Sequence, residues 1–214
     1  EAISDFSYDT RRNAYVVVYK QYSTGDLYQS YSTNGGTSWA SAIVISDNGA
    51  SSPNFIGRNA VVAYATSSDM RAVLVQKGSY MAVGISTDRN QSTVWTTSTV
   101  DRLIGYYDTN AGDWESARPL GISIDSSNNI HALYAVASST ALTYNIIYAS
   151  STNSGSSWAT TSISGTMGVL SADLSCMECG INASAIDPYT GRLSVMYFQM
   201  SAFDATAMGN GFLI

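Results

Sequence analysis

The segment 101–118 holds the richest set of side chains for ligand recognition. Tyrosine and tryptophan rings are mixed there with carboxylates and arginines, which suits sugar binding because rings stack on sugar faces and carboxylates accept hydrogen bonds from hydroxyls. The candidate ligand-binding residues of this segment are Tyr106, Tyr107, Trp114, Glu115 and Arg118. In a chain with 15 tyrosines, the alternative is that these rings pack the segment against the rest of the fold.

Another candidate is Glu178, which lies between Cys176 and Cys179. We expect the two cysteines to form a local disulfide, with free thiols as the alternative, because a zinc site would need two further ligands. The single histidine, His131, falls inside an apparent strand, where a packed side chain is expected. The sequence therefore predicts no metal site and no cofactor. Glu178 either contributes to a ligand site or is a solvated loop carboxylate.

Composition narrows the classes of function. Charged residues make up 12% of the 214 residues and the formal net charge is −6, which argues against a nucleic-acid partner, because such binding needs clustered lysine and arginine. No apolar run reaches the length that a membrane-spanning helix needs. No motif of a serine nucleophile, a zinc protease or a phosphate loop occurs, so no catalytic residue is assigned. A lysine-poor, hydroxyl-rich chain favours an extracellular or cell-surface protein whose signal peptide has been removed or left out.

The elements that must position these residues repeat along the chain. Short apolar or alternating runs, separated by Gly, Asn, Asp and Ser, predict many antiparallel strands and an all-β fold. A turn followed by a strand that ends in tyrosine recurs, and each copy follows another short strand. The spacing of the copies fits one four-stranded unit each. The predicted strand pairs are 2–8 with 14–19, 53–56 with 60–64, 119–124 with 130–134, and 181–186 with 192–197.

A turn with the frame Ser-x-Asn-x-Gly-x-x-Trp occurs twice. Its hydroxyl and amide oxygens are expected to bond backbone N–H groups, its glycine to supply a positive φ, and its tryptophan to fold back over the hairpin. Two weaker copies occur: one without the glycine runs from Ser86 to Trp95 and is expected to be the turn of the second unit, and one from Tyr107 to Trp114 is the alternative. The structural residues of the two full copies are Ser32, Asn34, Gly36 and Trp39, and Ser151, Asn153, Gly155 and Trp158.

This frame resembles the Asp-box, or BNR, motif of sialidases and related β-propellers, which normally has Asp where the two copies here have Asn. The resemblance implies a β-propeller, and because sialidase-type propellers have six blades, it implies a fragment, an assembling subunit or a non-catalytic relative. It also implies that ligands bind at the end away from the Asp-box turns, in the loops between blades and in the segments 21–26, 67–71, 138–142 and 200–206. The four blades expected in this chain cover about 1–46, 53–100, 118–164 and 181–214, the last one incomplete.

A sialidase also needs three arginines around the substrate carboxylate, a Tyr–Glu nucleophile pair and an Asp acid. The arginines that could reach the ligand end are Arg71, Arg102 and Arg118, and no Arg-Ile-Pro segment occurs. We therefore predict an exported binding module that recognises a glycan or a surface protein, or that forms a homo-oligomer or filament by adding a strand to its incomplete blade. The alternative is a sialidase-like glycoside hydrolase acting on sialylated or related glycans.

Overall fold

In the computed structural model of this chain, the described residues are 2–21, 27–45, 60–77, 80–87, 96–102, 117–137, 144–163, 184–187 and 192–195. Every regular element in these ranges is a β-strand, and every pair of neighbouring strands is antiparallel. The predicted all-β class is therefore confirmed. Over the same ranges, no helix long and apolar enough to cross a membrane is found.

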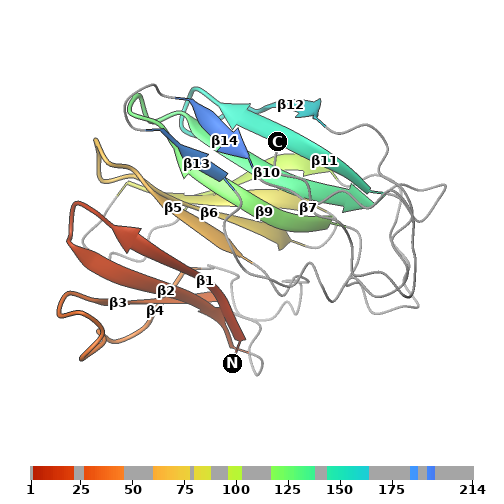
Figure 1. Ribbon diagram of the computed structural model, residues 1–214. Coiled ribbons are helices and arrows are strands. Elements are labelled where there is room, and N and C mark those ends of the chain that lie inside the picture. The colour runs from red at the N-terminus through yellow and green to blue at the C-terminus, as the bar shows by residue number, and fades with distance from the viewer. Residues whose placement is uncertain are drawn as a thin grey trace, which may run out of the picture.

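Within the described ranges, the strands form three four-stranded sheets and one two-stranded sheet, each built from strands that follow one another in the chain (Figure 1). The first sheet contains β1 (Ala2–Asp9), β2 (Ala14–Lys20), β3 (Leu27–Ser32) and β4 (Ile43–Val44). The second contains β5 (Val61–Tyr64), β6 (Arg71–Lys77), β7 (Tyr80–Ser86) and β8 (Thr96–Arg102). The third contains β9 (Ala117–Ile124), β10 (Ile130–Ala137), β11 (Tyr144–Ser151) and β12 (Ala159–Ser162). The fourth contains β13 (Ser184–Ile186) and β14 (Leu193–Val195).

The three larger sheets share one register, which the serine at the end of each third strand marks. Ser32 lies opposite Tyr15, Ser86 opposite Arg71, and Ser151 opposite Ile130. From there the pairing continues to the first strands, where Tyr8, Tyr64 and Ile124 are the partners of these three second-strand residues. Positions close to this serine in one sheet therefore have equivalent positions in the other two.

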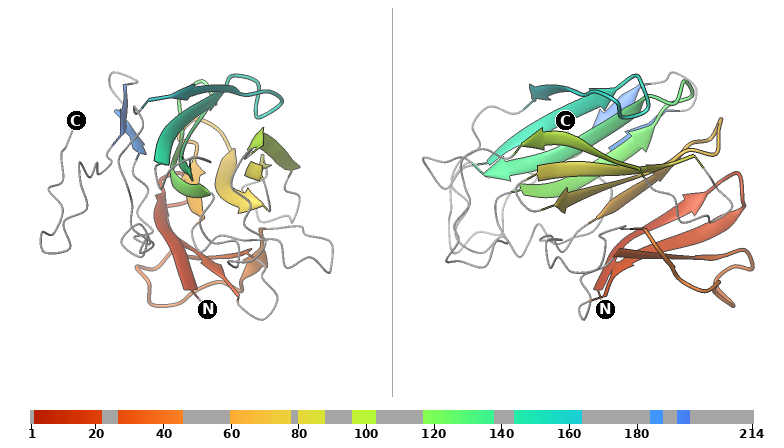
Figure 2. Two further views of the ribbon diagram at one scale, coloured as in Figure 1. Left: turned by 90° about the vertical axis from the view of Figure 1, so that its right-hand side faces the viewer. Right: turned by 180° about the vertical axis from the view of Figure 1, so that it is seen from behind.

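The first strands of successive sheets lie side by side. β5 contacts both β1 and β9, and β13 also contacts β9. From these strands the sheets spread apart, so that their later strands lie farther out (Figure 2). Neighbouring sheets thus pack face to face along their first and second strands.

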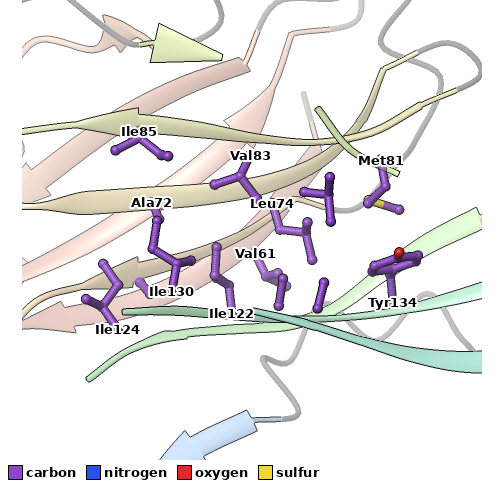
Figure 3. Close-up of a cluster of buried hydrophobic side chains, with 14 of the residues drawn as sticks. Val61, Ala72, Leu74, Met81, Val83, Ile85, Ile122, Ile124, Ile130 and Tyr134 are labelled. Carbon is purple, nitrogen blue, oxygen red and sulfur yellow. The ribbon is translucent and has the colours of Figure 1, made fainter. Parts of the chain in front are cut away.

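The core consists of layers between successive sheets. The larger layer lies between the second and third sheets, where residues such as Leu74, Met81 and Ile122 are at most 1% exposed (Figure 3). A smaller layer between the first and second sheets includes Val18 and Val62. Burying one such side chain contributes roughly 1.5–3 kcal/mol, so these layers hold the sheets together.

The second sheet differs from the sequence prediction in its strand order. The segment 60–64 was expected to be a second strand preceded by 53–56, but β5 is the first strand of its sheet and pairs with β6. The tyrosine signal was misleading because Tyr64 ends a first strand, whereas Tyr19 and Tyr134 lie in second strands. Residues 53–56 lie outside the described ranges. The turn over 65–70 therefore joins a first strand to a second, and the predicted position of segment 67–71 beside the ligand loops is wrong.

Candidate functional site

The first Ser-x-Asn-x-Gly-x-x-Trp turn is held by its own side chains. Ser32 Oγ donates to Asn34 Oδ1 over 2.9 Å and accepts from the Gly36 N–H over 2.9 Å. Asn34 Oδ1 also accepts from the Ser38 N–H over 2.9 Å, while Asn34 Nδ2 donates to Ser38 Oγ over 2.8 Å. Gly36 has φ of 87°, a region that favours glycine. The asparagine thus uses its oxygen as an Asp would and adds a donor that an Asp lacks.

The second turn repeats these bonds at equivalent atoms. Ser151 Oγ lies 2.9 Å from Asn153 Oδ1 and 2.8 Å from the Gly155 nitrogen, and the Ser157 N–H donates to Asn153 Oδ1 over 2.9 Å. Gly155 has φ of 83°. The tryptophans differ, because Trp158 packs against the core layer between the second and third sheets, whereas Trp39 is 43% exposed.

The turns between first and second strands meet at one end of the sheets, which we call the turn end. Arg11 in the turn after β1 lies 3.5 Å from Asp69 in the turn after β5. In the same turn, Ser67 Oγ donates to the Ser126 carbonyl over 2.9 Å, and Ser68 Oγ donates to Asn128 Oδ1 over 2.5 Å. The turns of three successive sheets are thus linked by direct contacts.

Asp125 organises the third-sheet turn. Its carboxylate accepts from the backbone N–H of Ser127 and from the backbone and side chain of Asn129, over 2.8–2.9 Å. Burial acts to raise the pKa of Asp125, but these bonds and the contact with His131 hold it below its ordinary value. His131 Nδ1 also lies 2.7 Å from the Tyr148 hydroxyl. His131 is therefore a hydrogen-bonded residue of β10, and in the described ranges no group of three or more His, Cys, Asp or Glu side chains could hold a metal ion.

A buried polar cluster lies between the first and second sheets. Asp5 on β1 is 3% exposed, and its carboxylate accepts from the Val62 N–H over 2.7 Å and from the Phe6 N–H over 2.9 Å. Burial raises the pKa of Asp5 to about 6, although both hydrogen bonds act to lower it. The Tyr64 hydroxyl donates to Gln29 Oε1 over 3.1 Å, and burial also raises the Tyr64 pKa.

Arg71 belongs to the same region and corrects a prediction. It was expected to reach the ligand end, but it is 0% exposed and begins β6 next to the turn end. Its Nη2 donates to Ser86 Oγ over 3.2 Å. Ser86 is the equivalent of Ser32 and Ser151, so this serine of the weaker turn copy bonds an arginine side chain. Arg71 is therefore unavailable to clamp a substrate carboxylate.

Strand β8 ends and strand β9 begins at the ends of the sheets away from these turns, which we call the loop end. Arg102 is the last residue of β8 and pairs with Tyr80, while Arg118 lies near the start of β9 and pairs with Ala135. Both positions are at the opposite end of their strands from the turns. Of the predicted site residues, Tyr106, Tyr107, Trp114, Glu115, Glu178 and the cysteines Cys176 and Cys179 lie outside the described ranges.

The structure also presents an aromatic surface that the sequence analysis missed. On the outer face of the β1–β2 hairpin, Phe6 is 59%, Tyr8 43% and Tyr15 39% exposed. The rings of Phe6 and Tyr15 are stacked with centroids 5.6 Å apart, and those of Tyr8 and Tyr15 are tilted at 5.3 Å. The alternate spacing of Phe6 and Tyr8 indicates that both rings lie on one face of the strand. Alternation alone does not show whether that face is covered by another sheet.

Comparisons with known proteins show limited likeness. The sequence matches no protein-family model and no curated protein. Among solved structures, NanB sialidase from Streptococcus pneumoniae with a chlorobenzylammonio-ethanesulfonate ligand matches with 19% identity and a TM-score of 0.42, over 65% of this chain and 19% of NanB. NanB with Optactamide matches with 18% identity, a TM-score of 0.43 and the same coverage. The GH43 endo-arabinanase from Bacillus licheniformis matches with 12% identity and a TM-score of 0.43, over 91% of this chain and 73% of that one. This chain thus spans about a fifth of the length of NanB.

Proposed function

We propose that the chain is an exported, non-catalytic β-propeller module that recognises a glycan through the loop end of its blades. The observation that supports this most directly is the division between the two ends. At the turn end, the turns bond themselves and one another, as Ser68 does to Asn128 and Arg11 to Asp69. The segment 101–118 instead starts and finishes at the loop end, where β8 ends and β9 begins. Binding residues are commonly found on loops that a rigid scaffold positions.

The ligand class follows from the composition of that segment. Tyr106, Tyr107 and Trp114 would stack on sugar rings, while Glu115 would accept hydrogen bonds from hydroxyls and Arg118 would donate to them or to a carboxylate. Glu178 is a further candidate from the connection before β13. A second possibility is that the ligand is a surface protein. A third is that the incomplete last blade accepts a strand from another chain.

A glycan array probed with the purified chain tests this proposal. We expect a subset of glycans to bind and Trp114→Ala to weaken that binding by at least about tenfold, in line with the loss of a central aromatic contact. Trp39→Ala is the matched control, because it removes the same ring at the turn end and should leave binding unchanged. Binding that Trp114→Ala leaves intact, or no binding to any glycan, would contradict the proposal.

The alternative function is that of a sialidase-like hydrolase. The burial of Arg71 leaves Arg102 and Arg118 from the predicted arginine set, and a carboxylate clamp of the sialidase type needs three. A fluorogenic sialoside decides between the two. The binding module releases no fluorophore, whereas turnover that Arg118→Ala abolishes would establish the hydrolase.

A further inference from the structure

The aromatic surface of the first sheet occupies positions that are buried in the other sheets. Phe6 is equivalent to Val62 and Ile122. Each of the three lies two positions before the first-strand residue that pairs, through the second strand, with the serine at the end of the third strand. Val62 and Ile122 are both 1% exposed, whereas Phe6 is 59% exposed. The next pair shows the same contrast, since Tyr15 is 39% exposed while its equivalents Arg71 and Ile130 are 0% exposed.

The cause of this contrast is the sheet that precedes. In the second and third sheets, this face packs against the sheet before it, and the resulting layers contain Val62 and Ile122. Trp39 follows the same pattern, because its equivalent Trp158 packs into the layer between the second and third sheets. The described ranges hold no sheet that covers this face of the first sheet. Its exposed aromatic residues are Phe6, Tyr8, Tyr15 and Trp39.

The fourth sheet presents the complementary face. Ile186 pairs with Leu193, and the Asp187 N–H bonds the Arg192 carbonyl as the Asp125 N–H bonds that of Asn129. Ile186 is therefore equivalent to Ile124 and Tyr8; it is half-buried, and its strand β13 contacts β9 of the third sheet. The adjacent pair, Ala185 with Ser194, points to the other face and is exposed.

The sizes of the residues on the two faces fit each other. Near the end of each first strand, one residue on the face toward the next sheet is small, and the residue that follows it, on the opposite face, is large. This alternation leaves room for one sheet to seat its large side chain over the small residue of its neighbour. The small residues are Ser7, Ala63, Ser123 and Ala185, and the large ones are Tyr8, Tyr64, Ile124 and Ile186.

We propose that a second copy of this chain covers the aromatic surface, with its fourth sheet packed head-to-tail on the first sheet. The contact continues the packing that already joins successive sheets within the chain, with Tyr8 of one copy seated over Ala185 of the other. Within one chain both surfaces are exposed, so they do not cover each other. A head-to-tail contact uses two different surfaces, so two copies close a ring or many copies form a filament. It joins sheet faces and is separate from strand addition at an edge.

Sedimentation velocity over a dilution series of the whole chain tests the proposal. We expect reversible association, weakened at least about tenfold by Phe6→Ser with Tyr15→Ser, since buried aromatic anchors dominate such contacts. Ala185→Arg, at the other surface, should weaken it as much. Ile163→Ser is the matched control, because Ile163 is 41% exposed at the outer edge of the third sheet. All these residues are exposed in the single chain, so the variants should fold.

A mixture of the two kinds of variant gives the direction of the contact. A head-to-tail pair keeps one intact contact in a mixed dimer, so the mixture should associate more tightly than either variant does alone. A chain that stays monomeric at all concentrations would overturn the proposal. Association lost in Phe6→Ser with Tyr15→Ser but kept in Ala185→Arg would also overturn it, because that result means a symmetric contact between two aromatic surfaces. Glycan binding through the segment 101–118 is read out separately and is independent of either result.

Discussion

The carboxylate of Asp5 on β1 accepts a 2.7 Å hydrogen bond from the backbone N–H of Val62 on β5, 57 positions later in the chain. Asp5 is 3% exposed, so this bond lies inside the layer between the first and second sheets. A backbone donor buried there needs a partner, and a carboxylate removed from water needs hydrogen bonds. The pair therefore fixes the position of one first strand against the next.

Asp5→Asn should change how stability depends on pH. The pKa of Asp5 rises from 3.8 to about 6 on folding, so the folded state binds the proton more tightly. The resulting stabilisation is complete below pH 3.8 and is lost as the pH rises to about 6, by at most about 3 kcal/mol. Between pH 4 and 7, the free energy of unfolding in urea should fall by more in the wild type than in Asp5→Asn. Parallel curves for the wild type and Asp5→Asn would contradict this prediction.

Asn34 should be replaceable by Asp but not by Ala. Asn34→Asp keeps the oxygen that accepts from Ser32 and from the Ser38 N–H, so it should cost less than about 0.5 kcal/mol. Asn34→Ala removes both acceptor contacts and should lower the free energy of unfolding by about 1–2 kcal/mol. Asn153→Asp and Asn153→Ala should repeat this pattern in chemical denaturation, because the second turn has the same bonds. Equal losses for Asp and Ala would show that the amide oxygen does not hold the turn.

The Tyr64–Gln29 contact should appear as a coupling between the two side chains. Tyr64→Phe leaves the buried Gln29 oxygen without this donor and should cost about 1 kcal/mol. Gln29→Met combined with Tyr64→Phe also removes the polar group, so the double variant should lose less than the two single losses together. Urea unfolding of the four proteins measures the coupling. Strictly additive losses would mean that the hydrogen bond contributes nothing to stability.

The strands and the repeated turn were predictable from the sequence because their signals are local. Alternation of apolar residues and the Gly, Asn and Asp clusters between them depend on neighbours in the chain. The same applies to the turn residues Ser32, Asn34 and Gly36, which bond one another within a few positions. The predicted strand order of the second sheet was wrong because tyrosine fits either a first or a second strand, as Tyr64 and Tyr19 show.

The contacts between sheets were not predictable from the sequence. Asp5 and Arg71 are charged residues that local patterns place at a surface, and their burial depends on which sheet face meets which. The exposure of Phe6 could not be foreseen for the same reason, since its equivalents in the other sheets are buried. Such features follow from the order in which the sheets stack, and a single sequence carries little information on that order.

The amide resonance of Val62 during a pH titration tests the central claim, that β1 and β5 stand side by side as first strands of successive sheets. We predict that the Val62 nitrogen and proton shifts titrate with a midpoint near pH 6 and that Asp5→Asn abolishes this titration. A Val62 amide that does not respond, or that responds equally in Asp5→Asn, would contradict the arrangement of the sheets on which every proposal above depends.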